Sequence, residues 1–252
     1  MVHLRALPGA PLFGGSMAEV IDAALADARA LAGGGADGLV FENFGDRPFA
    51  KGRVEAETVA AMARVITEVV AEVRMPFGVN VLRNDAASAI AIAAATGASF
   101  IRVNIHTGAM LTDQGIIEGD AANTMRLRAA LAPHLLVFAD HLVKHAVPLA
   151  PVDERQSVRD LRLRGLADAI VVDGVETGIA VDPERLRTVR EALPQAPLII
   201  GSGLTPENAD AYGDADAAIA GTSLKAGADV GAPVEAGRVG RLAEAFKRRG
   251  GR

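Results

Sequence analysis

Eight short apolar segments alternate with longer, alanine-rich amphipathic segments along the whole chain, and this alternation limits the possible folds more than any other feature. The short segments are apolar on both faces, which is typical of strands in a buried parallel sheet. The longer segments carry helix signals: Ser16 and Glu19 match a capping box, and Pro183 suits the first turn of a helix. The pattern therefore predicts repeated strand–helix units.

The predicted strands are residues 2–7, 38–42, 77–82, 100–105, 135–139, 169–172, 197–200 and 217–220. The predicted helices are residues 16–33, 55–74, 85–96, 120–131, 153–164, 182–193 and 234–248, with a short one starting near Thr205. Eight such units in 252 residues predict an α/β fold, a single (β/α)₈ barrel domain over residues 1–252. The alternative is a doubly wound open sheet, which usually has a G-x-G-x-x-G fingerprint after its first strand, where this chain reads PGAPLFGGS.

Composition excludes several classes of protein. The net charge is −5 and no basic cluster precedes the short C-terminal tail, so nucleic acid is not an expected partner. No charge-free apolar run reaches the roughly 18 residues of a membrane span, and the N-terminus lacks the apolar region of a signal peptide. The chain has no cysteine, which excludes disulfides and thiolate metal sites. A cytoplasmic protein is expected, and alanine-rich outer helices are compatible with a homo-oligomer.

Two glycine-rich loops follow the last two predicted strands, GSGLTPEN at 201–208 and GTSLK at 221–225. Glycines let the backbone approach an anion closely, and Thr205 is placed to cap a short helix whose N–H groups would face that anion. In barrels, phosphate sites often lie in the loops after strands seven and eight. The predicted phosphate-binding residues are Gly201, Ser202, Gly203, Gly221, Thr222 and Ser223.

Acidic and imidazole side chains stand at the ends of other predicted strands, where barrel enzymes carry their catalytic groups. The candidates are Glu42, His106, Asp140, His141 and Asp173. They suit general acid–base catalysis, or a divalent metal held by Glu42, Asp140 and Asp173. Because neighbours on a strand point in opposite directions, Asp140 and His141 cannot share one face.

Further polar residues near these strand ends are expected to contact the substrate: Asn43, Asn80, Asn104, Lys144 and Lys225. Both lysines fall in loops, which favours a counter-ion role over a Schiff base. His3, on the first strand, is interpreted as a packed core residue. The long segments 44–54 and 107–119 are interpreted as lids over the site, with disordered loops as the alternative.

Seven segments in order resemble the BtpA/SgcQ family: VHLRALPGAPLFGGSMAEVI, DGLVFENFGDRPF, IRVNIHTGAMLTDQGIIEGDAANTMRLR, KHAVPL, GLADAIVVDGVETG, GSGLTPENADAY and GTSLKAG. The resemblance covers nearly the whole chain and implies a barrel of the ribulose-phosphate-binding kind. The family takes its name from a cyanobacterial factor for photosystem I, and other members belong with carbohydrate genes. One departure is Val172-Asp173-Gly174, where the family usually has serine or threonine in the middle.

Three functions follow as hypotheses. The first is an enzyme acting on a small phosphorylated metabolite, a sugar or ribosyl phosphate, by lyase, isomerase or glycosyl-transfer chemistry. The second, which the resemblance implies, is a non-enzymatic assembly factor related to photosystem I biogenesis. The third is a metal-dependent hydrolase that uses a divalent cation.

Overall fold

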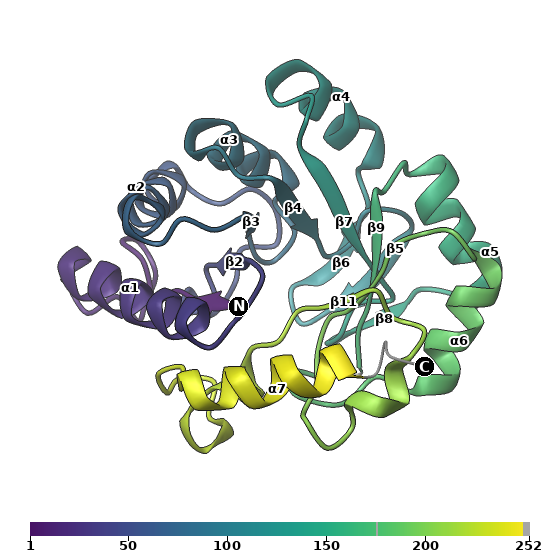
Figure 1. Ribbon diagram of the computed structural model, residues 1–252. Coiled ribbons are helices and arrows are strands. Elements are labelled where there is room, and N and C mark those ends of the chain that lie inside the picture. The colour runs from purple at the N-terminus through teal and green to yellow at the C-terminus, as the bar shows by residue number, and fades with distance from the viewer. Residues whose placement is uncertain (175, 249–252) are drawn as a thin grey trace.

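The computed structural model describes residues 1–174 and 176–248, and its centre is a parallel sheet of eight strands that curls into a barrel (Figure 1). The strands are β1 (Val2–His3), β2 (Leu39–Glu42), β3 (Phe77–Asn80), β4 (Phe100–Val103), β7 (Leu136–His141), β9 (Ala169–Val172), β10 (Leu198–Ile200) and β11 (Ala217–Ala218). They lie side by side in chain order. The nitrogen of Met1 donates to the carbonyl of Ala220 at 2.8 Å, which joins the two ends of the sheet. The predicted (β/α)₈ barrel is confirmed.

Helices surround this barrel (Figure 1). They are α1 (Met17–Gly33), α2 (Ala56–Glu72), α3 (Ala86–Thr96), α4 (Ala121–Leu131), α5 (Glu154–Arg159), α6 (Pro183–Ala192) and α7 (Ala236–Arg248). A π-helical turn, η1 (Asp160–Arg164), continues α5. Ser16 caps α1, and aspartate side chains cap α3, α4, α5 and α6, so these helices begin where the sequence predicts. None of the helices in the described part of the chain is long and apolar enough to cross a lipid bilayer.

The seventh unit differs from the others because its helical part is only a 3₁₀ turn, η2 (Ala209–Tyr212). Two more 3₁₀ turns, η3 (Thr222–Leu224) and η4 (Ala226–Ala228), follow β11. The chain between β10 and α7 is therefore mostly loop and tight turn. This leaves the backbone of residues 201–208 and 221–225 close to the end of the barrel that carries the polar residues.

The interior of the barrel changes from apolar to charged along its axis. Phe100 of β4 and Phe138 of β7 stack with their ring centroids 4.4 Å apart. Arg102 and Asp140 lie two residues further along the same strands. Because alternate residues of a strand face the same side, they form the next layer inside the barrel. A Cβ on Gly78 would lie 2.2 Å from the Phe100 ring, so glycine is what admits this ring. The polar layer lies at the carboxyl ends of the strands, which we call the mouth.

Segment 107–119 is regular structure, so its interpretation as a disordered loop is wrong, whereas its role as a lid stays a prediction. It forms a hairpin of β5 (Ala109–Thr112) and β6 (Gly115–Glu118), and β5 also pairs with β8 (Ala146–Pro148) in a three-stranded antiparallel sheet. Met110 and Ile117 of the hairpin pack on Ile105 and Val143. This apolar contact holds the hairpin against the barrel.

Candidate active site

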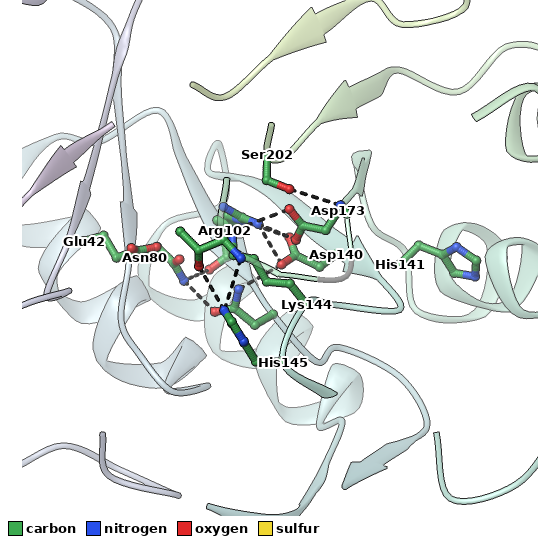
Figure 2. A network of polar contacts seen from close by, with 12 residues as sticks. Glu42, Asn80, Arg102, Asp140, His141, Lys144, His145, Asp173 and Ser202 are labelled. Atoms are coloured by element: carbon green, nitrogen blue, oxygen red, sulfur yellow. Dashed lines mark hydrogen bonds and ion pairs between the residues drawn. The ribbon is translucent and has the colours of Figure 1, made fainter. Parts of the chain in front are cut away.

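The mouth gathers polar side chains from five neighbouring strands. Figure 2 shows Glu42 of β2, Asn80 of β3, Arg102 of β4 and Asp140 of β7 near Asp173, which follows β9. All five residues are buried. In the sequence, Arg102 lies 38 residues from Asp140 and 71 residues from Asp173, so only the folded sheet brings these side chains together.

Arg102 is the centre of this group. Its Nε and Nη2 donate to the two carboxylate oxygens of Asp140 at 2.8 and 2.9 Å, and Nη2 also donates to Asp173 at 2.7 Å. Lys144 lies on the other side of Asp173, with Nζ 3.5 Å from Oδ1. Two buried carboxylates thus face two cations, of which Lys144 is partly exposed. Arg102 was not among the site residues predicted from the sequence, although its place in the strand that also carries Asn104 could have indicated it.

Two amides hold this group in place. Asn104 donates to Oδ2 of Asp140 at 2.8 Å, and Asn80 donates to Asn104 at 3.0 Å and to the carbonyl of Arg102 at 3.1 Å. Oδ1 of Asn80 is buried and has no hydrogen-bond partner in the described part of the chain. Asn104 therefore orients the carboxylate of Asp140, and Asn80 holds Asn104 and the backbone of Arg102 in place.

The two carboxyl groups titrate differently. Burial raises the pKa of Asp140 to about 6 against the attraction of Arg102, and the charge of Asp173 adds to the rise. Burial acts on Asp173 in the same direction, but the charges of Lys144 and Arg102 outweigh it and lower the pKa of Asp173 to about 2. The two carboxyl groups share one guanidinium and therefore titrate as a coupled pair. Because the pKa of Asp140 is the higher of the two, Asp140 takes up a proton first as the pH falls.

Glu42 and His3 form a second, separate pair. Oε2 of Glu42 lies 3.6 Å from Nε2 of His3, and each side chain is 8% exposed. Burial raises the pKa of Glu42 despite Arg102 and Lys144 nearby, and burial together with surrounding cations lowers the pKa of His3 well below its usual value. The structure places His3 in the wall of the site rather than in the apolar core that the sequence suggested. A carboxyl group with a raised pKa next to a neutral imidazole suits proton transfer.

A cavity of about 150 Å³, the inner pocket, connects the glycine-rich loops to these side chains. Its lining includes Ser202, Gly203, Thr222 and Ser223 on one side and His3, Glu42, Arg102 and Lys144 on the other. No hydrogen bond among the described residues uses the N–H groups of Ser202, Gly203 or Thr222. These N–H groups therefore border the cavity, and none of them has a hydrogen-bond acceptor in the described part of the protein.

The backbone of the first loop is held by its neighbours. Oγ of Ser202 accepts from the N–H of Gly174 at 3.0 Å. Gly203 has φ +68°, and a Cβ there would lie 2.2 Å from the carbonyl oxygen of Ile179. A Cβ on Gly201 would lie 2.3 Å from Oδ1 of Asp173. The glycines are thus required by close packing at the base of the loop.

Two predictions about these loops are wrong. Thr205 does not begin a helix aimed at an anion, because its N–H donates to Oδ1 of Asn208 at 2.8 Å and only a 3₁₀ turn follows. Lys225 does not reach the inner pocket. Its Nζ is buried between Asp27 at 3.3 Å and the carbonyl of Ala232 at 2.9 Å, so its contacts are those of a structural ion pair.

Three other candidates lie away from the inner pocket. His106 is buried outside the inner pocket, and its Nε2 lies 2.8 Å from the carbonyl oxygen of Gly165. The ring of His141 points away from the cluster in Figure 2, toward Glu154 at the start of α5, as strand alternation requires once Asp140 faces inward. Asn43 bonds to the backbone of Leu82, which ties the loops after β2 and β3 together. Their positions do not fit the catalytic and substrate-binding roles that the sequence suggested.

The carboxylates do not form the metal site considered for them. Asp140 and Asp173 both bond to Arg102, whereas Glu42 faces His3. Among residues 1–174 and 176–248, no group of three histidine, aspartate or glutamate side chains is arranged to hold a metal ion. The donor set of this mouth therefore suits binding of an anion and transfer of a proton.

Fold and site together define a (β/α)₈ barrel whose mouth holds a pocket between glycine-rich loops and buried charged side chains. The chain belongs to the BtpA family, whose model matches residues 1–248. It is 42% identical over 247 residues to the photosystem I biogenesis protein BtpA of Synechocystis sp., an alignment that covers 98% of this chain and 86% of that protein.

More distant likenesses agree with this assignment. The putative sgc region protein SgcQ of Escherichia coli is 35% identical over 229 residues, which cover 89% of this chain and 84% of SgcQ. The crystal structure of orotidine 5′-phosphate decarboxylase from Pyrococcus horikoshii matches with a TM-score of 0.58 and 12% identity, over 90% of this chain and 94% of that one. At such low identity this last likeness concerns the fold.

Proposed function

We propose that the protein is an enzyme that acts on a small phosphorylated metabolite, a sugar or ribosyl phosphate, bound at the mouth of the barrel. One observation carries the proposal: a single cavity has free backbone N–H groups and hydroxyls on one wall and a buried acid–base pair on the other. The first wall suits a phosphate group and the second suits the reacting part of the same molecule. The inner pocket is therefore the proposed active site.

The phosphate group would accept hydrogen bonds from the N–H groups of Ser202, Gly203 and Thr222 and from the hydroxyl of Ser223. Backbone N–H groups in glycine-rich turns form concave anion sites of this kind. Lys144, which also lines the inner pocket, adds positive charge. The fold likeness to orotidine 5′-phosphate decarboxylase, whose name refers to a phosphorylated compound, supports the same ligand class.

At the reacting end, Glu42 is the group we assign to proton transfer. Burial raises the pKa of Glu42, which makes its carboxylate a stronger base than an exposed one, and the neutral imidazole of His3 lies beside it. Arg102 fixes Asp140 and Asp173, and Asp173 in turn holds Lys144 over the cavity. Isomerase, lyase and glycosyl-transfer reactions all need such a proton transfer. The geometry therefore supports proton transfer, which is the step that these three reactions share.

Isothermal titration calorimetry tests the proposal with a panel of sugar phosphates, their phosphate-free counterparts and inorganic phosphate. We expect binding by phosphorylated compounds, at least about ten-fold weaker binding by the free sugars, and no binding to Ser202→Asp, because a carboxylate repels phosphate. Ser99→Asp, at an exposed position at the opposite end of β4, is the matched control and should bind as the wild type does. Thr222→Asp, which is less buried than Ser202, repeats the test in the second loop. The proposal is wrong if no phosphorylated compound binds, or if both loop variants bind normally.

A second candidate is a role in the assembly of another protein complex, because the 42% identical relative is named for photosystem I biogenesis. This role needs a protein partner and does not need an intact pocket. An affinity pull-down with wild type, Glu42→Gln and Asp173→Asn separates the two functions. A stoichiometric partner that all three proteins retain would favour assembly, and the absence of any such partner would remove it.

A further inference from the structure

Arg83, in the loop after β3, is a buried cation that no carboxylate contacts directly, although Asp140, Asp113 and Glu42 lie near enough to attract it. It is 5% exposed, yet it forms no ion pair with any residue of 1–174 or 176–248. Taking a charged group out of water is unfavourable unless an opposite charge meets it. Because arginine stays protonated in proteins, the residue cannot avoid this cost by losing its charge. A largely buried guanidinium without an ion-pair partner therefore suits the binding of an anionic ligand.

The guanidinium of Arg83 is held in one orientation. Its Nη2 donates to the carbonyl of Lys144 at 2.8 Å, and its backbone N–H donates to Ala50 at 3.2 Å. The next residue, Asn84, bonds to both the N–H and the carbonyl of Ile105. The remaining N–H groups of the guanidinium have no hydrogen-bond partner among the described residues, and none of their nitrogen atoms is fully buried.

Those donors border a second cavity of about 650 Å³, the outer pocket, whose lining includes Arg83, Arg47, Phe44 and Lys144. The outer pocket shares Glu42, Phe44, Lys144 and Thr222 with the inner pocket, so the two are neighbouring parts of one site. Asp113 and Asp229 also line it, but both are exposed and their charges are screened by water. One small molecule can therefore reach from the phosphate loops to Arg83.

We propose that Arg83 binds a second anionic group of the substrate, so that the substrate carries an oxyanion, a carboxylate or a second phosphate, at the end opposite the first phosphate. The inference rests on the proposed function and narrows its substrate class to compounds with two anionic ends. The planar guanidinium group can donate two parallel hydrogen bonds to either kind of anion, a carboxylate or a phosphate. Lys144 then lies between the two anions and can interact with either one.

Calorimetry on the full chain tests this with four probes: inorganic phosphate, fructose 6-phosphate, fructose 1,6-bisphosphate and 3-phosphoglycerate. We expect wild type to bind at least one of the two doubly anionic probes about ten-fold or more tightly than fructose 6-phosphate. In Arg83→Gln that preference should disappear while the affinity for inorganic phosphate changes less than two-fold. Arg83→Lys, which keeps the charge but loses the fork, should retain only part of the preference. Arg53→Gln, at an exposed position on a nearby segment, is the matched control.

The outcomes separate the two proposals. If inorganic phosphate and all phosphorylated probes fail to bind wild type, the proposed function itself is wrong. If phosphate binds but wild type shows no preference for either doubly anionic probe, or if Arg83→Gln keeps the preference, the role of Arg83 is wrong. Should Arg83→Gln fail to fold, the wild-type comparison and Arg83→Lys still decide the question. The bisphosphate and 3-phosphoglycerate arms show whether the second anion is a phosphate or a carboxylate.

Discussion

Arg102 neutralises two buried carboxylates at once, and its side chain is only 1% exposed. Removing one member of a buried charge group leaves the others without compensation in a medium of low dielectric constant. In Arg102→Met, Asp140 would keep the amide of Asn104 and Asp173 would keep Lys144, but both would lose the guanidinium that contacts them directly. We expect this variant to lose about 3–5 kcal/mol of unfolding free energy in urea denaturation.

Arg64→Met is the matched control, because the exposed pair of Arg64 with Glu68 should contribute about 0.5 kcal/mol or less. Adding Asp140→Asn to Arg102→Met should recover part of the loss, since one uncompensated charge is then gone. A loss below about 1 kcal/mol in Arg102→Met would show that the network adds little to stability.

His141 should make stability depend on pH. Burial, with Arg185 nearby, lowers the pKa of His141 to about 3, whereas in the unfolded chain it is near 6.5. Between these values the unfolded state binds more protons, so the contribution of neutral His141 is present above pH 6.5 and is lost as the pH falls toward 3. In His141→Phe, the loss of stability between pH 6.5 and 5 should be smaller by about 2 kcal/mol than in wild type.

Urea denaturation at a series of pH values measures this slope. His134→Phe, at an exposed position, should leave it unchanged. Equal slopes for wild type and His141→Phe would mean that the imidazole is not held neutral in the folded protein.

The residues of the mouth illustrate what local pattern can and cannot predict. Strand alternation was enough to show that Asp140 and His141 face opposite sides, because that geometry depends only on neighbours in the chain. The pairing of Arg102 with Asp173 depends on two strands 71 residues apart that meet only in the closed barrel. Lys225 looked like a pocket residue for the same reason: its partner Asp27 lies 198 residues away.

At the level of elements, the hairpin β5–β6 is where the sequence prediction failed. Its first strand, β5, is the central strand of the three-stranded sheet and also pairs with β8, so that Leu111 lies opposite Val147. Such pairing between distant short segments leaves no periodic signal, whereas the starts of the long helices depend on local residues and were predicted correctly. The helix expected at Thr205 failed because the side chain of Asn208 takes the N–H that a helix start would have left free.

Gly119 fixes the exit of this hairpin. A Cβ there would lie 2.5 Å from the backbone of His106 and Thr107, and backbone atoms cannot turn aside as a flexible side chain can. We expect Gly119→Ala to lower the unfolding free energy by about 1–3 kcal/mol and to speed hydrogen exchange in β5 and β6. Gly14→Ala, where a Cβ would meet nothing within 4 Å, is the control. If both variants behave alike, the hairpin does not depend on this close contact.

The main apolar core joins the two ends of the chain. It runs from Val2 through the barrel strands to Ala245 of α7, and the bond between Met1 and Ala220 closes the ring of strands. Neither half of the chain can bury its apolar surface without the other. Length and strand count predicted this architecture because a (β/α)₈ repeat is encoded locally, unit by unit. The chemistry at its mouth required the closed ring.

We therefore expect one cooperative unfolding transition. Tyr212 is the single tyrosine and the chain has no tryptophan, so its fluorescence reports on η2, where its hydroxyl donates to the carbonyl of Val181. Circular dichroism in the far ultraviolet reports on all helices together. The two probes should give the same urea midpoint, as a two-state transition requires. Separate midpoints would mean that the barrel unfolds in parts, which larger domains can do.

The same urea denaturation, repeated in the presence of inorganic phosphate, tests whether phosphate binds to the folded protein. A ligand that binds only the folded state adds about 2.7 kcal/mol at 100 times its dissociation constant, so both midpoints should rise together. Phosphate also stabilises proteins in general by exclusion from their surface, and this part should persist in Ser202→Asp. The difference between wild type and Ser202→Asp then measures binding at the inner pocket. If the two proteins gain equally, the phosphate effect is general, and the stability of the whole barrel is independent of the loops at its mouth.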